Sequence, residues 1–281
     1  MIDDPLQPSR GTRIALIGLA VLIVALLLVM PLAMVLGAAF AKGVQVWGAA
    51  LVEPDAIAAL ELTLTTAAIV IPLNAFFGMA TAWAVTRFEF PGKRVLLALL
   101  DLPFAVSPVV AGLCLVLLFG REGWFAQWLD AWGLKVLFAR PGIVLATLFI
   151  TFPFVARELI PLMQQQGAEE ELAARSLGAG AWQVFRRVTL PNIKWALLYG
   201  VLLCGARAMG EFGAVSVVSG HIRGLTNTLP LHIEILYNEF NATAAFAVAS
   251  LLAGLALVTL VVRFWLEARH GDALARTHPR H

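Results

Sequence analysis

Long stretches of this chain carry no charged side chain, and this feature limits its possible folds more than any other. The uncharged runs cover 28 residues at 14–41, 25 residues at 62–86 and 23 residues at 240–262. A helix needs about 20 apolar residues to cross the hydrocarbon core of a bilayer. Charged residues make up 14% of the chain, against about 25% in soluble domains. The sequence therefore predicts an all-α membrane protein.

Three further apolar stretches contain ionisable residues. Asp101 interrupts one, Arg157 and Glu158 interrupt the next, and Arg207 and Glu211 interrupt the third. We expect the first run to be retained, because the apolar part of a signal peptide is only about 7–15 residues long. The predicted spans number six, at about 14–40, 57–85, 95–119, 141–163, 193–220 and 242–265.

The distribution of Lys and Arg predicts which side each loop faces, because basic residues collect on the cytoplasmic side of short loops. With the N-terminus inside, 12 basic residues fall on the inner side and 5 on the outer side. The segments 1–13 and 266–281 become cytoplasmic tails around a permease domain at 14–265. The polar segment 164–192 also becomes cytoplasmic.

Two outer segments are amphipathic. Residues 123–133, "GWFAQWLDAWG", contain three tryptophans, a residue that prefers the headgroup level of a membrane. We expect an interfacial helix there. Residues 228–238, "TLPLHIEILYN", place Ile233, Leu236 and Tyr237 on one helical face, so this segment is expected to lie on the membrane or dip into it.

The polar segment contains the run "EEELAARSLGAGAWQVFRRVTLP" at 169–191. Its three glutamates suit the positive end of a helix dipole, and good helix formers follow them. Gly178 and Gly180 permit a chain reversal. Trp182, Phe185 and Val188 give a second short helix one apolar side. The predicted unit is a helix–turn–helix whose narrow first helix could enter a cleft of a partner, although the composition equally fits an amphipathic loop without one.

The same run resembles the EAA motif of ABC importer permeases, in its spacing from Ala173-Ala174 to Gly178 and on to Leu190-Pro191. The family glutamate falls at Leu172, and the nearest acid, Glu171, lies one position earlier. The resemblance implies a type I ABC importer permease fold with cytoplasmic termini. It also implies a coupling helix that docks on a separate ATPase subunit, of which the transporter has two copies. The residues implied in docking are Glu171, Leu172, Ala173, Ala174, Arg175, Gly178, Leu190 and Pro191.

The resemblance also implies that ATP and Mg bind to the ATPase subunits and that this chain holds no cofactor or metal. The chain indeed contains no G-x-x-x-x-G-K-[ST] phosphate-binding motif. We therefore expect a transport subunit and not an enzyme.

Two more stretches, "DLPFAVSPVVAGL" at 101–113 and "ARAMGEFGAVSVVSG" at 206–220, resemble sulfate/thiosulfate permeases and the related molybdate permeases. Together with "RRVTLPNIKWALLYGV" at 186–201, they are most similar to the CysW kind. This resemblance implies a multi-pass protein of the bacterial cytoplasmic (inner) membrane that imports an oxyanion. It further implies a homologous permease as partner in a heterodimer, and a periplasmic or extracellular oxyanion-binding protein. The alternative cargo is molybdate, tungstate or another oxyanion.

Arg207 and Glu211 are four residues apart, so we expect them to share a helix face and form an ion pair. Such a pair either locks two spans together or lets Arg207 attract a passing oxyanion weakly. Pro103 and Pro108 predict a bend in the third span. The hydroxyls of Ser107 and Ser216 are further candidates for lining the pathway. The alternative explanation of the bend is a kink that only serves packing.

Two other classes of membrane protein fit the sequence less well. A self-contained secondary transporter would use Arg207 and Glu211 for coupling but would leave the polar segment unexplained. An intramembrane enzyme is the other class, but the H-E-x-x-H motif of metal-dependent hydrolysis is absent. Nothing in the sequence indicates nucleic-acid binding, and Cys114 and Cys204 lie in apolar runs where they serve as small hydrophobes.

Overall fold

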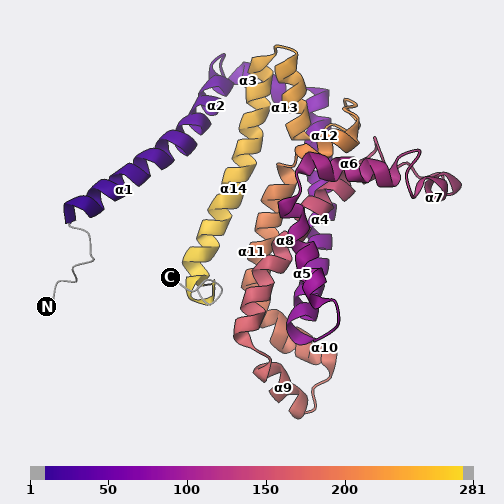
Figure 1. Ribbon diagram of the computed structural model, residues 1–281. Coiled ribbons are helices and arrows are strands. Elements are labelled where there is room, and N and C mark those ends of the chain that lie inside the picture. The colour runs from indigo at the N-terminus through magenta and orange to yellow at the C-terminus, as the bar shows by residue number, and fades with distance from the viewer. Residues whose placement is uncertain (1–9, 275–281) are drawn as a thin grey trace.

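The computed structural model describes residues 10–274, and every regular element in that range is a helix. A bundle of long helices forms the body, and the α9 segment projects from its lower end in the view of Figure 1. The elements are α1 (Arg10–Val24), the π-helical turn η1 (Ala25–Val29), α2 (Met30–Phe40), α3 (Val44–Leu51), α4 (Pro54–Arg87), α5 (Lys93–Ala105), α6 (Pro108–Phe119), α7 (Ala126–Ala131), α8 (Arg140–Gln166), α9 (Glu169–Ser176), α10 (Ala181–Val184), the π-helical turn η2 (Phe185–Thr189), α11 (Leu190–Met209), α12 (Gly213–Ser219), α13 (Leu229–Asn238) and α14 (Ala242–Leu274).

Small residues let α4, α8 and α11 pack closely in the body of the bundle. A Cβ atom on Gly78 would lie 2.8 Å from the Val155 side chain, and one on Gly200 would lie 3.1 Å from the Val155 Cα. Glycine at a helix crossing allows this approach, which is a common device between membrane helices. The three helices are therefore held in contact at one level.

A polar contact joins the same three helices. The Asn74 side chain on α4 donates to Thr151 Oγ1 on α8 at 2.7 Å and to Cys204 Sγ on α11 at 3.3 Å. All three side chains are buried. Because an unpaired amide is costly in an apolar interior, this contact favours one register of the three helices.

Five helical stretches among the described residues are long and apolar enough to cross a membrane. A sixth candidate is the pair α5 and α6, which meet at 113° across a short break. The described residues thus contain five candidate spans, or six if α5 and α6 form one broken span. The five stretches are Gly11–Phe40, Pro54–Arg87, Arg140–Gln166, Ala181–Met209 and Ala242–Leu266.

The predicted bent span at 95–119 is divided into two helices in the structure. Val106 and Ser107 are extended between the two helices, with ψ angles of 134° and 136°. The residue before a proline is sterically driven out of the helical region, so Ser107 cannot continue α5 into Pro108. Pro108 then begins α6, where its missing N–H is harmless. The bend predicted from the prolines is real, but it is a complete break.

The predicted span at 193–220 is displaced at both ends. Its helix begins at Ala181, runs through η2 and ends at Met209, followed by the separate helix α12. The expected second short helix is consequently continuous with the helix of that span. In η2 the Leu190 N–H reaches back five residues to the Phe185 carbonyl.

The other π-helical turn repeats this arrangement. Met30 N–H bonds to the Ala25 carbonyl, directly before Pro31, just as Leu190 stands before Pro191. A proline ring clashes with the carbonyl of the preceding turn. A wider turn just before it lets the helix pass a proline without stopping, and both long spans use it.

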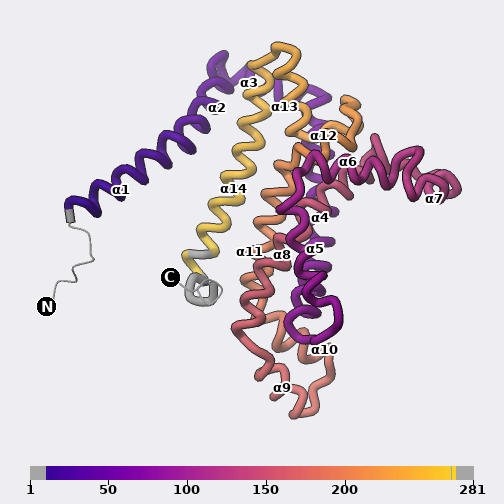
Figure 2. Tube along the Cα trace, in the orientation of Figure 1, coloured from indigo at the N-terminus to yellow at the C-terminus, as the bar shows by residue number. Residues whose placement is uncertain are grey.

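The first span leans away from the body in Figures 1 and 2. Within the first span, α2 is the part that packs against α14. The most apolar stretch of this span has no buried residue. The α13 segment, predicted to lie on the membrane or dip into it, packs against α4 and α14. Its Leu229 and Leu231 are fully buried, and Leu229 N–H donates to Thr63 Oγ1 at 2.9 Å.

Candidate functional site

The α9 helix ends in a turn that needs glycine. Ala179 N–H bonds to the Ala174 carbonyl at 3.1 Å, and Gly178 N–H bonds to the Arg175 carbonyl at 2.9 Å. This is the Schellman pattern, in which the residue at the position of Gly178 is left-handed. Gly178 has a φ of +85°, and nothing lies within 4 Å of the place where a Cβ would be. The requirement for glycine is thus one of backbone conformation and not of space.

Glu171 attaches α9 to the body of the protein. Arg87, the last residue of α4, donates from Nε to Glu171 Oε2 at 2.9 Å and from Nη2 to Oε1 at 3.2 Å. Thr189 Oγ1 in η2 donates to Glu171 Oε1 at 2.8 Å, and Arg87 Nη1 donates to the Met163 carbonyl on α8 at 3.0 Å. The two charged side chains are only 10% and 12% exposed. One carboxylate therefore connects α9 with α4 and η2, and its arginine extends the network to α8.

A second contact lies beside the first. Asn192 Nδ2 on α11 donates to Glu170 Oε2 at 2.5 Å, and Gln166 Nε2 on α8 donates to the Asn192 carbonyl at 3.3 Å. Two neighbouring glutamates thus hold α9 against the ends of the long helices. A displacement of α9 must be transmitted to these helices or must break the contacts.

The residues predicted for docking differ in how far they are exposed. Glu171 faces inward against Arg87 and is only 12% exposed, and its predicted role in docking stays a prediction. Outward exposure is found at Leu172, Ala173, Arg175, Gly178 and Pro191, while Ala174 and Leu190 are half-buried. Leu177, absent from the prediction, is 88% exposed at the tip of α9. Leu177 is apolar and is not packed against the body of the protein. Its exposure could not be predicted from the sequence, where leucine usually indicates a buried position.

The break between α5 and α6 lies beside the break between α11 and α12. A Cβ on Gly213, the first residue of α12, would lie 2.8 Å from the Pro108 side chain at the start of α6. A Cβ on Gly112 would lie 2.8 Å from the Ala214 carbonyl. Broken helices at membrane depth are tolerated where protein or a watery cavity covers their free backbone groups.

Arg207 and Glu211 meet at the second break. Arg207 Nη2 lies 2.7 Å from Glu211 Oε2, and the side chains are 34% and 1% exposed. The pair forms as predicted, but not on one helix face, because α11 ends at Met209 and Glu211 lies beyond it. Glu211 Oε1 instead accepts from Ala214 N–H at 3.0 Å. The carboxylate thus serves α12 as well as Arg207, while the guanidinium keeps an open side.

The two serines occupy different settings at these breaks. Ser107 is exposed and stands directly before α6, without a side-chain capping bond. Ser216 is half-buried and donates its hydroxyl to the Gly213 carbonyl at 2.9 Å. Ser107 therefore has a hydroxyl free to meet a passing anion, whereas the proton of Ser216 is already used.

Arg157 and Asp101 form a second pair of charges, which the sequence did not predict as a pair. Arg157 on α8 donates from Nη2 and Nε to Asp101 Oδ1 on α5, at 2.7 and 3.0 Å, and its guanidinium lies 4.4 Å from the centre of the Phe104 ring. The side chains are 51% and 58% exposed. These residues are 56 positions apart in the chain, so no local pattern could join them. Half-exposed charges within spans face water or another protein, because exposure to lipid is too costly.

No group of three or more His, Cys, Asp or Glu side chains that could hold a metal occurs in the part of the chain that the structure describes. The chemistry available is therefore that of guanidinium, carboxylate and hydroxyl groups. Such groups can attract and release an anion.

Comparison with known proteins places this arrangement in a family. Residues 74–271 match the profile of the family described as "Binding-protein-dependent transport system inner membrane component". The chain is 52% identical to the sulfate transport system permease protein CysW of Synechocystis sp. over 96% of this chain and 98% of that one. It is 52% identical to CysW of Escherichia coli over 94% and 90%, and 39% identical to CysT of Escherichia coli over 91% and 92%.

The fold is also shared with a solved structure. A chain of a bacterial ABC transporter that imports the acidic polysaccharide alginate matches with a TM-score of 0.74 at 17% identity, covering 93% of this chain and 96% of that one. Identity this low shows the fold alone. The chain therefore belongs to the family of binding-protein-dependent transport system inner membrane components.

Proposed function

We propose that this chain is a permease subunit of an ATP-driven importer of sulfate or thiosulfate in the bacterial cytoplasmic membrane. Its relatives at 52% identity are sulfate transport permeases, and they align over nearly the whole chain. The subunit forms the pathway with a homologous permease in a heterodimer. Two ATPase subunits bind ATP and Mg on the cytoplasmic side, and a binding protein delivers the oxyanion outside.

The observation that carries this proposal is the attachment of α9 through Glu171. The exposed tip of α9, with Leu172 and Leu177, is the surface offered to the ATPase. Its inner side is joined through Arg87 to α4 and through Thr189 to η2. A force applied at the tip therefore reaches α4 and the helix that leads into α11.

The motion then reaches the breaks. The α11 helix ends at the Arg207–Glu211 pair, beside the start of α6. Arginine can bind a tetrahedral oxyanion through two N–H groups. The nearby Glu211 carboxylate weakens this attraction, which suits a pathway, because a cargo that binds tightly is not released. Ser107 adds a hydroxyl at the same junction.

Uptake of radiolabelled sulfate tests the proposal in liposomes that contain this chain, its partner permease, the ATPase and the binding protein. We expect uptake that requires ATP and is lost when Gly178 is replaced by Asp, with less ATPase held in the complex. Uptake by this chain alone, without the ATPase, would identify a secondary transporter instead.

The cargo is tested in the same liposomes by competition. We expect excess thiosulfate to suppress labelled sulfate uptake, and molybdate or tungstate to suppress it much less. Stronger suppression by molybdate would reassign the chain to the molybdate branch. The Arg207→Gln variant, checked for normal abundance, should lose uptake if the guanidinium meets the cargo and should lose abundance if the pair is a structural lock.

A further inference from the structure

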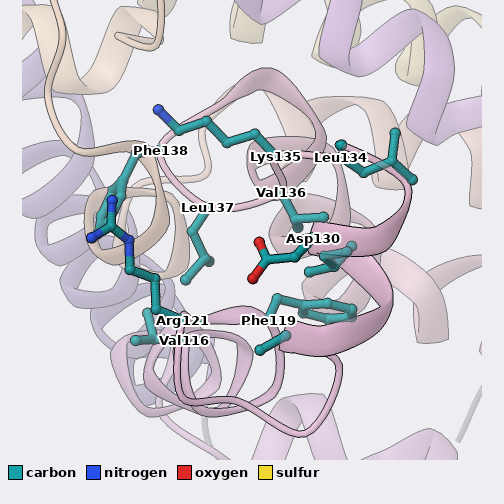
Figure 3. A pocket seen from close by; sticks show the side chains of 13 residues that line it. Val116, Phe119, Arg121, Asp130, Leu134, Lys135, Val136, Leu137 and Phe138 are labelled. Atoms are coloured by element: carbon teal, nitrogen blue, oxygen red, sulfur yellow. The ribbon is translucent and has the colours of Figure 1, made fainter.

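A cavity of about 620 Å³ lies between α6, α7 and the segment at 133–138 (Figure 3). Its volume falls in the range of small-molecule sites, about 300–1,000 Å³. The walls are largely apolar and include Val116, Phe119, Leu129, Leu134 and Leu137. In Figure 1 the helices α6 and α7, which line the cavity, lie far from α9, toward the opposite end of the bundle.

Three charged side chains line this cavity: Arg121, Asp130 and Lys135. Within residues 10–274, no ion pair or side-chain hydrogen bond joins any of the three to another residue. In Figure 3 the Asp130 carboxylate points into the middle of the cavity, while Arg121 and Lys135 rise along its other sides. The cavity thus offers two free cations and one free anion above apolar walls.

The surroundings indicate the surface of a membrane. Trp124, Trp128 and Trp132 are strongly exposed on and around α7, the helix that contributes Leu129 and Asp130 to the cavity. Tryptophan prefers the headgroup level, where its ring is covered and its N–H stays hydrated. Leu113 and Leu117 on α6 continue the apolar surface away from the charges. A molecule with a charged head and apolar tails matches this order of groups.

We propose that the cavity binds the headgroup of a phospholipid that carries both a phosphate and a primary ammonium group, the phosphatidylethanolamine class. The phosphate meets Arg121 and Lys135, and the ammonium donates hydrogen bonds to Asp130. The acyl chains follow the apolar surface of α6. The bound lipid holds the α6–α7 region at the level of the headgroups.

The charge pattern separates this lipid from its competitors. A phosphatidylglycerol headgroup has a phosphate but no cation, so it would leave Asp130 without a partner beside a negative ligand. A phosphatidylcholine headgroup has a cation, but its quaternary ammonium has no N–H to donate. A lone oxyanion would use the two cations and would leave Asp130 and the apolar walls uncompensated.

The test is to purify the full chain in nanodiscs of equal parts of the three lipids and to measure by native mass spectrometry which lipids stay bound after release. We expect the wild-type protein to retain phosphatidylethanolamine over phosphatidylcholine by about fivefold, the size expected of one good exposed ion pair. Equal retention of all three lipids, or preference for phosphatidylglycerol, would overturn the proposal.

Variants locate the site. Asp130→Asn should abolish discrimination between phosphatidylethanolamine and phosphatidylcholine while still retaining lipid. The Arg121→Gln/Lys135→Gln double variant should lose retention of all three. Arg140→Gln is the matched control, since Arg140 is an exposed cation near this end that does not line the cavity. If the control has the same effect as the double variant, the attraction is general and not sited. None of these measurements depends on uptake, so they stand apart from the proposed cargo.

Discussion

The Arg87–Glu171 pair and the Arg157–Asp101 pair each join two helices, and their surroundings are opposite. Arg87 and Glu171 are 10% and 12% exposed and share further bonds with Thr189 and the Met163 carbonyl. Arg157 and Asp101 are 51% and 58% exposed. A buried charge pair is stable only when other hydrogen bonds satisfy it, and its disruption is costly. An exposed pair contributes little to stability and remains accessible to other charged groups.

The difference indicates two tasks. The Arg87–Glu171 pair is built as a joint, because each partner is held from several helices and neither is open to exchange. The Arg157–Asp101 pair leaves half of each side chain accessible on a surface formed by α5 and α8. We infer that the first pair transmits displacement of α9, and that the second provides a charged surface within the spans.

Replacement of Glu171 by Ala should give the largest effect. It removes the acceptor of Arg87 and of Thr189, and each lost bond to a charged group costs about 1.5–3 kcal/mol. We expect a lower melting temperature in detergent and loss of ATP-dependent sulfate uptake in liposomes. Glu169→Ala is the matched control, since Glu169 is exposed in the same turn. Equal losses in both variants would contradict the joint.

Replacement of Gly178 should weaken the same connection by straining the backbone at the end of α9. Ala at a φ of +85° costs about 1–2 kcal/mol, although the site is open. We expect Gly178→Ala to loosen the end of α9 and reduce ATPase retention in pull-down. Asn tolerates left-handed conformations better, so Gly178→Asn should retain more of the ATPase. If Asn were worse than Ala, side-chain volume at the docking surface would matter more than the turn.

Neutral variants of the exposed pair should have unequal effects on transport. If Arg157 attracts the oxyanion, Arg157→Gln should lower uptake severalfold while Asp101→Asn preserves it. The stability change should stay below about 1 kcal/mol for either variant, as is usual for exposed pairs. Uptake and thermal unfolding are measured on the same preparations. Equal losses of uptake and stability in both variants would show a structural lock.

The smallest effect is expected at a third pair, which calibrates the comparison. Lys93 Nζ lies 2.7 Å from Glu89 Oε1, and the Glu89 side chain is 89% exposed. An exposed pair of this kind is worth about 0.3–0.5 kcal/mol. Glu89→Gln should therefore leave melting temperature and uptake nearly unchanged. A large loss would mean that Glu89 contacts a partner subunit.

Much of the architecture follows from the order of residues. Uncharged runs predict helices long enough to span a bilayer. The run at 62–86 lies within α4, and the run at 240–262 lies in α14 apart from its first two residues. Pro108 predicts an interruption of the helix and Gly178 predicts a chain reversal. Both predictions are local, because proline and glycine affect the backbone conformation of their own and adjacent residues. The resemblance of the 169–191 segment to importer permeases is likewise a matter of local spacing.

Other features depend on residues that are far apart in the chain. Arg87 and Glu171 are separated by 84 positions, and Asp101 and Arg157 by 56. Local periodicity could place each of them on a helix but could not say which charge meets which. The displaced fifth span and the inward turn of Glu171 have the same origin, since the packing of α4, α8 and α11 decides which polar groups are covered. Local sterics act over a few residues and are readable in sequence, whereas burial and pairing of charges are properties of surfaces that exist only once the helices have packed.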